Sequence, residues 1–161
     1  MMSNDSLYAH VKEVSIFLAD SLHEISSYLN NCKLADLMSE DGSRDSGYYM
    51  ELLKALRRLE VFCDEANDTV NGLLREEPMR ETAAERTLYG IHHQCILGFF
   101  SPKNDAWYEN SRASYSGRQS ITFYHQPPYS FLRLMAHLEK SFQRMREELS
   151  YYETTYQKRM S

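Results

Sequence analysis

Apolar residues recur at alternating steps of three and four residues over three long stretches of this chain. Residues with that spacing share one face of an α-helix, so each stretch predicts an amphipathic helix. The first predicts a helix over residues 5–30, whose stripe comprises Leu7, Val11, Val14, Leu18, Leu22, Ile25 and Leu29. Such a helix is stable in water when its stripe is covered, so the three stretches are expected to pack together.

The second stretch has the most regular steps of the three. Its stripe comprises Tyr49, Leu52, Leu56, Leu59, Cys63, Ala66, Val70 and Leu73. Pro78 follows soon afterwards, and the helix is expected to end before it because proline disfavours helical backbone in the preceding residue. The first two helices together predict an antiparallel hairpin over residues 5–74, with residues 34–47 as the connector.

The third stretch predicts a C-terminal helix over residues 130–158. Pro127 and Pro128 cannot continue a preceding element, and Ser130 is a residue type that caps the start of a helix. The stripe comprises Leu134, Leu138, Phe142, Met145, Leu149, Tyr152 and Tyr156.

The middle of the chain, residues 86–126, is predicted to be rich in β-structure. Two aromatic runs, 107–115 and 121–124, are separated by a turn-forming stretch at residues 116–120. Loop, run, turn and run in this order predict a small antiparallel meander. The segment 86–100 is compatible with either helix or strand, because it combines helix-favouring residues with glycines and bulky side chains. We interpret it as a strand from about Leu88.

The predicted fold class is therefore α+β, with three long amphipathic helices packed against a small antiparallel β-meander. An all-α bundle is the alternative. The chain has 161 residues, which is enough for one ordinary domain and too few for two, so a single domain over residues 1–161 is expected.

The cysteines and the apolar runs indicate the compartment. Cys32, Cys63 and Cys95 form an odd set without a Cys-x-x-Cys pair, which is typical of a reducing environment. The polar N-terminus has neither the basic nor the apolar region of a secretory signal. The longest nearly continuous apolar run, residues 95–100, is far shorter than the roughly 20 residues of a membrane span. We predict a cytoplasmic protein that does not associate with a membrane.

The charge distribution argues against nucleic acid as the partner. The chain has a net charge of −5, with 7 Lys/Arg against 15 Asp/Glu in residues 1–77 and 11 against 8 in residues 78–161. Nucleic-acid-binding proteins usually present a basic domain or stripe. Attraction between the two halves explains this asymmetry without a partner, and an anionic partner of the C-terminal half is the alternative.

Trp, Tyr and Arg, the residue types enriched at binding hot spots, are concentrated between residues 107 and 118. We therefore predict a non-enzymatic interaction or regulatory protein that contacts another protein through this region. The predicted contact surface comprises Trp107, Tyr108, Glu109, Arg112, Tyr115 and Arg118. Two alternatives stay open: the aromatic side chains pack in the core above a solvated Glu109/Arg112 ion pair, or the chain forms a homodimer through uncovered helix surface.

A small hydrolase or ribonuclease is the rival hypothesis. Arg86 and His92 loosely fit the Arg-x(4–6)-His pattern of the helical ribonucleases called HEPN domains, in which Arg binds the scissile phosphate and His moves a proton. Glu109 and Arg112 are a second candidate pair. The chain has no Gly-x-Ser-x-Gly, His-Glu-x-x-His or glycine-rich phosphate-loop motif, so no catalytic residue is assigned.

Two groups of residues resemble metal-binding sets but lack the required spacing. His92, His93 and Cys95, with His125 more distant, have neither Cys-x-x-Cys nor His-x-x-x-His spacing. The ladder at Glu60, Asp64 and Asp68 lacks the Glu-x-x-His motif of di-metal bundles and is typical of a solvated acidic face. No metal and no cofactor is predicted.

Three stretches of the chain carry a family resemblance. They are Phe99-Phe100-Ser101-Pro102-Lys103, then Trp107-Tyr108-Glu109 with Ser111, Arg112, Tyr115 and Gly117, and Arg146-Glu147-Glu148-Leu149 with Tyr151-Tyr152-Glu153-Thr154. The chain resembles the small uncharacterised YpuI-like proteins of Bacillus-type bacteria over most of its length. The resemblance implies a bacterial cytosolic protein and brings no catalytic residue with it.

Overall fold

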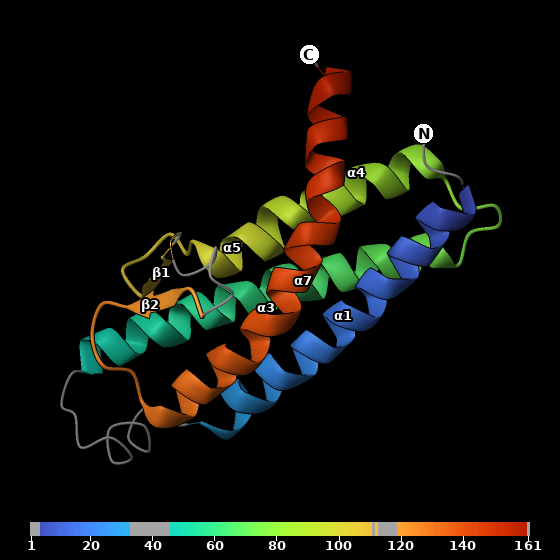
Figure 1. Ribbon diagram of the computed structural model, residues 1–161. Coiled ribbons are helices and arrows are strands. Elements are labelled where there is room, and N and C mark those ends of the chain that lie inside the picture. The colour runs from blue at the N-terminus through green and yellow to red at the C-terminus, as the bar shows by residue number, and fades with distance from the viewer. Residues whose placement is uncertain (1–3, 33–45, 111, 113–118, 161) are drawn as a thin grey trace.

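In the part of the chain that the structure describes, four helical rods lie side by side, and successive rods run in opposite directions (Figure 1). The computed structural model describes residues 4–32, 46–110, 112 and 119–160, with side chains as far as residue 153. The rods are α1 (Asn4–Asn31), α3 (Ser46–Leu74), the continuous segment α4 (Glu81–Ile91), η1 (His92–Ile96) and α5 (Leu97–Phe100), and α7 (Tyr129–Met160). The predicted connector 34–47 lies almost entirely outside the described residues.

The three predicted long helices are confirmed, and their apolar stripes form the core. Every described residue of the three stripes is buried or half-buried. Tyr156, the last residue of the third stripe, lies outside the residues whose side chains are described. α1 packs along α3 and also contacts α7, so the stripes cover one another as their spacing requires.

The predicted strand from about Leu88 is wrong, because residues 81–100 form a fourth helical rod. One row of its buried residues, Leu88, His92, Ile96 and Phe100, recurs at steps of four beside a second row at Ile91, Cys95 and Phe99. Four residues of an α-helix turn through about 400°, so this row would drift by about 40° at each step. The π-helical turn η1, with its wider i→i+5 hydrogen bonding, takes up the drift and keeps the row facing inward.

The β-structure is a two-stranded antiparallel sheet within the described residues. β1 (Trp107–Glu109) pairs with β2 (Ile121–Phe123), with Trp107 opposite Phe123 and Glu109 opposite Ile121. Both strands lie in the predicted aromatic runs. The fold class is therefore α+β, with a sheet smaller than the expected meander because residues 88–100 supply helix. We call β1 and β2 the hairpin.

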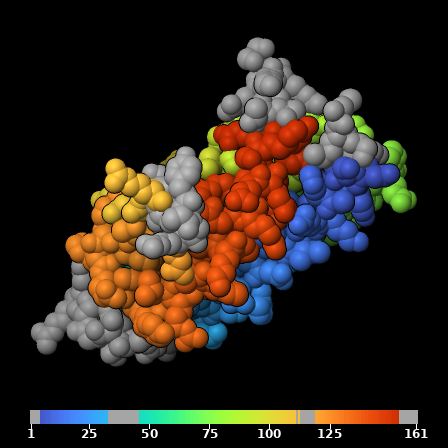
Figure 2. All heavy atoms as spheres, viewed as in Figure 1, coloured from blue at the N-terminus to red at the C-terminus, as the bar shows by residue number. Residues whose placement is uncertain are grey.

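The hairpin lies beside α7 on the face shown in Figure 2, where α1 borders the other side of that helix. In the described ranges, every helix is too short or too polar to span a bilayer.

Candidate functional site

Trp107, the centre of the predicted contact surface, lies in the core. Its side chain is 2% exposed, and its indole Nε1 donates a hydrogen bond of 2.7 Å to the carbonyl oxygen of Phe99. Its ring also packs against Phe123 and Phe131, with centroid separations of 6.4 and 5.8 Å. Trp107 therefore anchors the inner side of the hairpin to α5 and α7 and cannot contact a partner.

The outer side of the hairpin presents an exposed pair of tyrosines. Tyr108 and Tyr124 are 42% and 51% exposed, and their ring centroids are 5.0 Å apart. Arg112 is also exposed, and its backbone N–H donates to Asn110 Oδ1 at 3.1 Å. Tyr124 is not among the contact residues predicted from the sequence, because its place depends on how the two strands pair. Tyr108 is opposite Thr122, so Tyr124 is a diagonal neighbour of Tyr108 on the same face of the sheet.

We call Tyr108, Arg112 and Tyr124 the hairpin face. Of the other predicted contact residues, Tyr115 and Arg118 lie outside the described residues.

Glu109 is paired with Arg146 of α7 and not with Arg112. The two Arg146 terminal nitrogens lie 2.9 and 2.7 Å from the two Glu109 carboxylate oxygens, a bidentate arrangement. The guanidinium carbon also lies 3.8 Å from the centroid of the Phe100 ring. Because both charged side chains are about one-fifth exposed and held from two sides, this pair fixes the hairpin to α7 and α5.

A second carboxylate of α7 holds the start of β2. Glu139 is 5% exposed, and its oxygens accept hydrogen bonds from the backbone N–H groups of Ser120 at 2.9 Å and Ile121 at 3.1 Å. These donors have no strand partner at this end of the sheet, so the carboxylate supplies the acceptors that buried N–H groups need. Together with Trp107 and the Glu109–Arg146 pair, it makes the hairpin a fixed platform.

The two adjacent histidines of η1 share one carboxylate. His92 Nδ1 lies 2.8 Å from Glu153 Oε2, and His93 Nε2 lies 3.5 Å from Glu153 Oε1 and 2.7 Å from the Tyr89 hydroxyl. His92 is buried and its Nδ1 contact is not aligned as a hydrogen bond, whereas His93 is exposed. Burial lowers the pKa of His92, with His93 and Arg146 acting in the same direction and Glu153 opposing them.

The structure does not assemble the candidate ribonuclease pair. Arg86 is exposed on α4, whereas His92 is buried one and two-thirds turns further along the same rod. Neither residue lines any of the three surface depressions described below. Bringing a phosphate to both groups at once would require His92 to leave the core.

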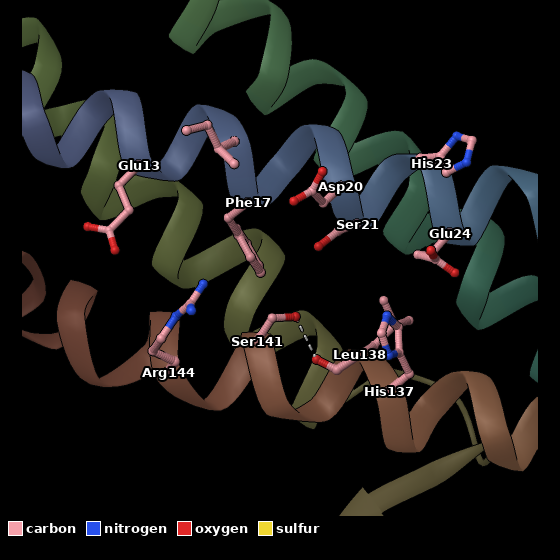
Figure 3. A pocket seen from close by; sticks show the side chains of 11 residues that line it. Glu13, Phe17, Asp20, Ser21, His23, Glu24, His137, Leu138, Ser141 and Arg144 are labelled. Atoms are coloured by element: carbon pink, nitrogen blue, oxygen red, sulfur yellow. Dashed lines mark hydrogen bonds between the residues drawn. The ribbon is translucent and has the colours of Figure 1, made fainter.

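The first depression is a groove of about 370 Å³ between α1 and α7 (Figure 3). Figure 3 shows Phe17 at its middle, Glu13 and Arg144 towards one end, and His23 and His137 towards the other. Burial and the neighbouring Glu13 carboxylate raise the pKa of Glu148, which lies near the Glu13 end of the groove. The side chains that line the groove carry charges of both signs, so the groove favours no single class of ligand.

The second depression is a groove of about 540 Å³ between α3 and the segment η1–α5. We call it the α3–α5 groove. The third is a shallow depression of about 550 Å³ beside the hairpin, lined by Tyr48, Glu51, Asp105, Tyr124 and His125 with Gly47. It adjoins the hairpin face through Tyr124.

The cysteines are free thiols, with Cys63 and Cys95 buried. Contact with the Cys95 thiol, together with burial, raises the pKa of Cys63 well above its ordinary value, so it stays protonated.

No cluster of three or more His, Cys, Asp or Glu side chains able to hold a metal ion occurs among the described residues. His92 and His93 diverge, one buried and one exposed.

Comparison with known proteins assigns the chain to a family. Residues 11–158 match the family model described as Protein of unknown function (DUF3907). The chain belongs to this family. It is also 41% identical over 154 residues to the uncharacterized protein YpuI of Bacillus subtilis (strain 168), covering 96% of this chain and 86% of that protein. The resemblance to YpuI-like proteins is thereby confirmed, and no solved structure matches.

The three stretches that carry this family resemblance meet in space. Phe100 comes from the first, Glu109 from the second and Arg146 from the third, and Arg146 contacts both of the others. The contact that attaches the hairpin to α7 and α5 therefore uses one residue from each stretch.

Proposed function

We propose that this member of the DUF3907 family is a non-enzymatic cytoplasmic interaction protein that binds another protein through the hairpin face. The observation that carries the proposal is the exposed Tyr108–Tyr124 pair, whose rings already contact each other without a partner. Tyrosine and arginine are enriched at the energetic centres of protein interfaces, and exposed contiguous aromatic side chains mark such surfaces.

The anchoring of the hairpin supports this role. A partner that orders a loose loop loses binding free energy to that ordering, whereas a preformed surface avoids the loss. Trp107, Glu109 and Glu139 each tie the hairpin to a helix, so the two tyrosines are presented in a fixed geometry. The burial and the contacts of these three anchoring residues are explained by a role in positioning the hairpin rather than by a role in catalysis.

The shallow depression beside Tyr124 indicates the chemistry of the partner. Glu51 and Asp105 lie in it together with two tyrosines and a histidine. A cationic side chain would stack on a tyrosine face and pair with a carboxylate at the same place. We therefore propose a partner segment that presents Arg or Lys to this depression.

The test uses the immobilised protein to capture partners from lysate of the source cell. We expect one protein to be retained by the wild type and lost by the Tyr108→Ala/Tyr124→Ala double variant, since removal of a hot spot costs about 2 kcal/mol or more, roughly 30-fold in affinity. Tyr8→Ala, which removes a tyrosine with 41% exposure on α1, is the matched control and should retain the same protein.

Purifying the captured protein and measuring its dissociation constant completes the test. An identical set of captured proteins for the wild type and the double variant would reject the hairpin face. Light scattering on the wild type and on the double variant tests the homodimer alternative. If the wild type is a dimer and the double variant is a monomer, the partner is a second copy of this chain.

A further inference from the structure

The α3–α5 groove is a concave depression of about 540 Å³ away from the hairpin face, and its lining contains no acidic residue. The chain as a whole has 23 Asp and Glu residues and a net charge of −5, so the charge of this groove is opposite in sign to that of the molecule. Its charged or titratable lining residues are Arg58 from α3, His93 from η1 and Lys103 from the loop after α5. The groove therefore presents a positive rim on an acidic protein.

The two permanent cations of the rim are available to a ligand. On the same helix, Lys54 and Arg57 lie 3.6 and 3.0 Å from the carboxylates of Glu51 and Glu60. Among the described residues, neither Arg58 nor Lys103 has a carboxylate within ion-pair distance. Both are exposed, and they line the groove from two different segments, Arg58 from α3 and Lys103 from the loop after α5. An anion in the groove is therefore offered cations from both segments.

The floor of the groove is apolar and partly open. Leu59 is buried beneath it, and Phe62 and Leu97 are half-buried along its walls. A Cβ atom added to Gly98 would meet no atom within 4 Å, so the absence of a side chain at this position leaves space in the groove. The floor thus accepts apolar atoms and the rim accepts negative charge.

The dimensions favour a small ligand over a protein surface. The lining residues of α3 run from Ala55 to Phe62, which is about 10 Å of helix. A volume of about 540 Å³ falls within the range of small-molecule sites, about 300–1,000 Å³. A stable protein partner instead covers about 800 Å² on each side, far more than this groove offers.

We propose that the α3–α5 groove binds a single-chain amphiphile with an anionic head. The head, a carboxylate or a phosphate, pairs with Arg58 and Lys103, and the chain lies over Phe62, Leu97 and Gly98. This site is separate from the hairpin face, so it stands or falls independently of the proposed function.

Calorimetric titration of the full-length protein with decanoate, below the concentration at which it forms micelles, tests the site. We expect saturable binding of one decanoate per chain. Arg58→Gln together with Lys103→Gln should weaken it at least 10-fold, and neutral decanol should bind at least 10-fold more weakly than decanoate. Decyl phosphate in place of decanoate shows which head binds more tightly, and either order supports the site.

Gly98→Leu is the decisive variant, because its Cβ meets no atom within 4 Å and the rest of its side chain would occupy the groove, which should abolish binding. Gly90→Leu makes the same change on α4, where an added Cβ also meets nothing within 4 Å, and should bind as the wild type does. Circular dichroism melts verify that both variants fold.

Three results would overturn the proposal: no saturable decanoate binding, equal binding by Gly98→Leu, or equal binding of decanol. Binding of a glutamate-rich peptide without binding of decanoate would likewise replace it with a peptide site. The Tyr108→Ala/Tyr124→Ala variant should bind decanoate normally, which keeps failure of this site distinguishable from failure of the hairpin face.

Discussion

His92 is a neutral histidine held inside the helical bundle. Its side chain is 3% exposed, and burial outweighs the attraction of the Glu153 carboxylate, so its pKa lies below the ordinary 6.5. His92 is therefore harder to protonate in the folded protein than in the unfolded chain. Below about pH 6.5 the unfolded state binds more protons than the folded state, so the free energy of unfolding falls as the pH falls.

We predict that lowering the pH from 7.5 to 5.5 reduces the free energy of unfolding, and that His92→Gln shows a smaller reduction. The contribution of His92 is fully present above pH 6.5 and is lost as the pH falls towards its lowered pKa. Urea denaturation at both pH values measures the difference. His23→Gln, which changes an exposed histidine of α1, should behave as the wild type; equal pH dependence in both variants would contradict the prediction.

Residue type alone could indicate the hairpin region but not which side chains face outward. Trp107 and Tyr108 are adjacent and both are typical of hot spots, yet one is buried against Phe99 and the other is 42% exposed. Alternation along a strand predicts that they face opposite ways but does not say which way is inward. The inward side is the one on which Trp107 packs against Phe131 and Glu109 pairs with Arg146, both contacts with the distant helix α7 that local sequence cannot reveal.

At the scale of elements, three-and-four spacing predicted three helices, whereas the fourth carried signals of both helix and strand. α1, α3 and α7 begin and end within about three residues of their predicted bounds. The rod from Glu81 to Phe100 does place Ala84, Leu88, Ile91 and Cys95 at steps of four, three and four, but its two glycines and the extra bulky residues beside this row fit a strand equally well. A π-helical turn is rare and has no sequence signature of comparable strength.

Gly90 offers a check that this part of the rod is regular and has room for a side chain. Alanine is favoured over glycine in a helix interior by about 0.5–1 kcal/mol, and an added Cβ at Gly90 meets no atom within 4 Å. We predict that Gly90→Ala raises the free energy of unfolding by about that amount, as measured by urea denaturation. Destabilisation would contradict the open surroundings of Gly90, because only a clash of the new methyl group could outweigh the gain in backbone entropy.

At the scale of the whole molecule, Phe142 connects three rods. Its ring stacks on Phe99 of α5 with a centroid separation of 4.3 Å and an interplanar angle of 19°, and it meets Phe17 of α1 edge-on at 4.9 Å. Phe142 was predicted as a stripe residue, but both partners lie outside the three predicted stripes. Spacing identifies which residues are buried on their own helix and leaves their partners on other rods unspecified.

We predict that Phe142→Ala lowers the free energy of unfolding by about 3–5 kcal/mol, because a cavity opens where three rods meet. A loss of that size is a large part of the 5–15 kcal/mol that stabilises an ordinary domain. Chemical denaturation measures it, and Val61→Ala, at a side chain 47% exposed on α3, should stay within about 0.5 kcal/mol of the wild type. A loss below 1 kcal/mol would show that the rods do not share this contact.

The π-helical turn makes the length of this segment matter as well as its composition. A turn closed by i→i+5 hydrogen bonds holds one residue more than a turn of α-helix, so five of its residues turn the chain about as far as four α-helical residues do. Deleting Gln94 would therefore let this segment close into a regular α-helix while Phe99 still faces Phe142 and Gly98 still lines the α3–α5 groove. Relatives that keep this architecture should therefore tolerate the loss of one residue between residues 92 and 96 far more readily than the loss of one residue elsewhere in the rod.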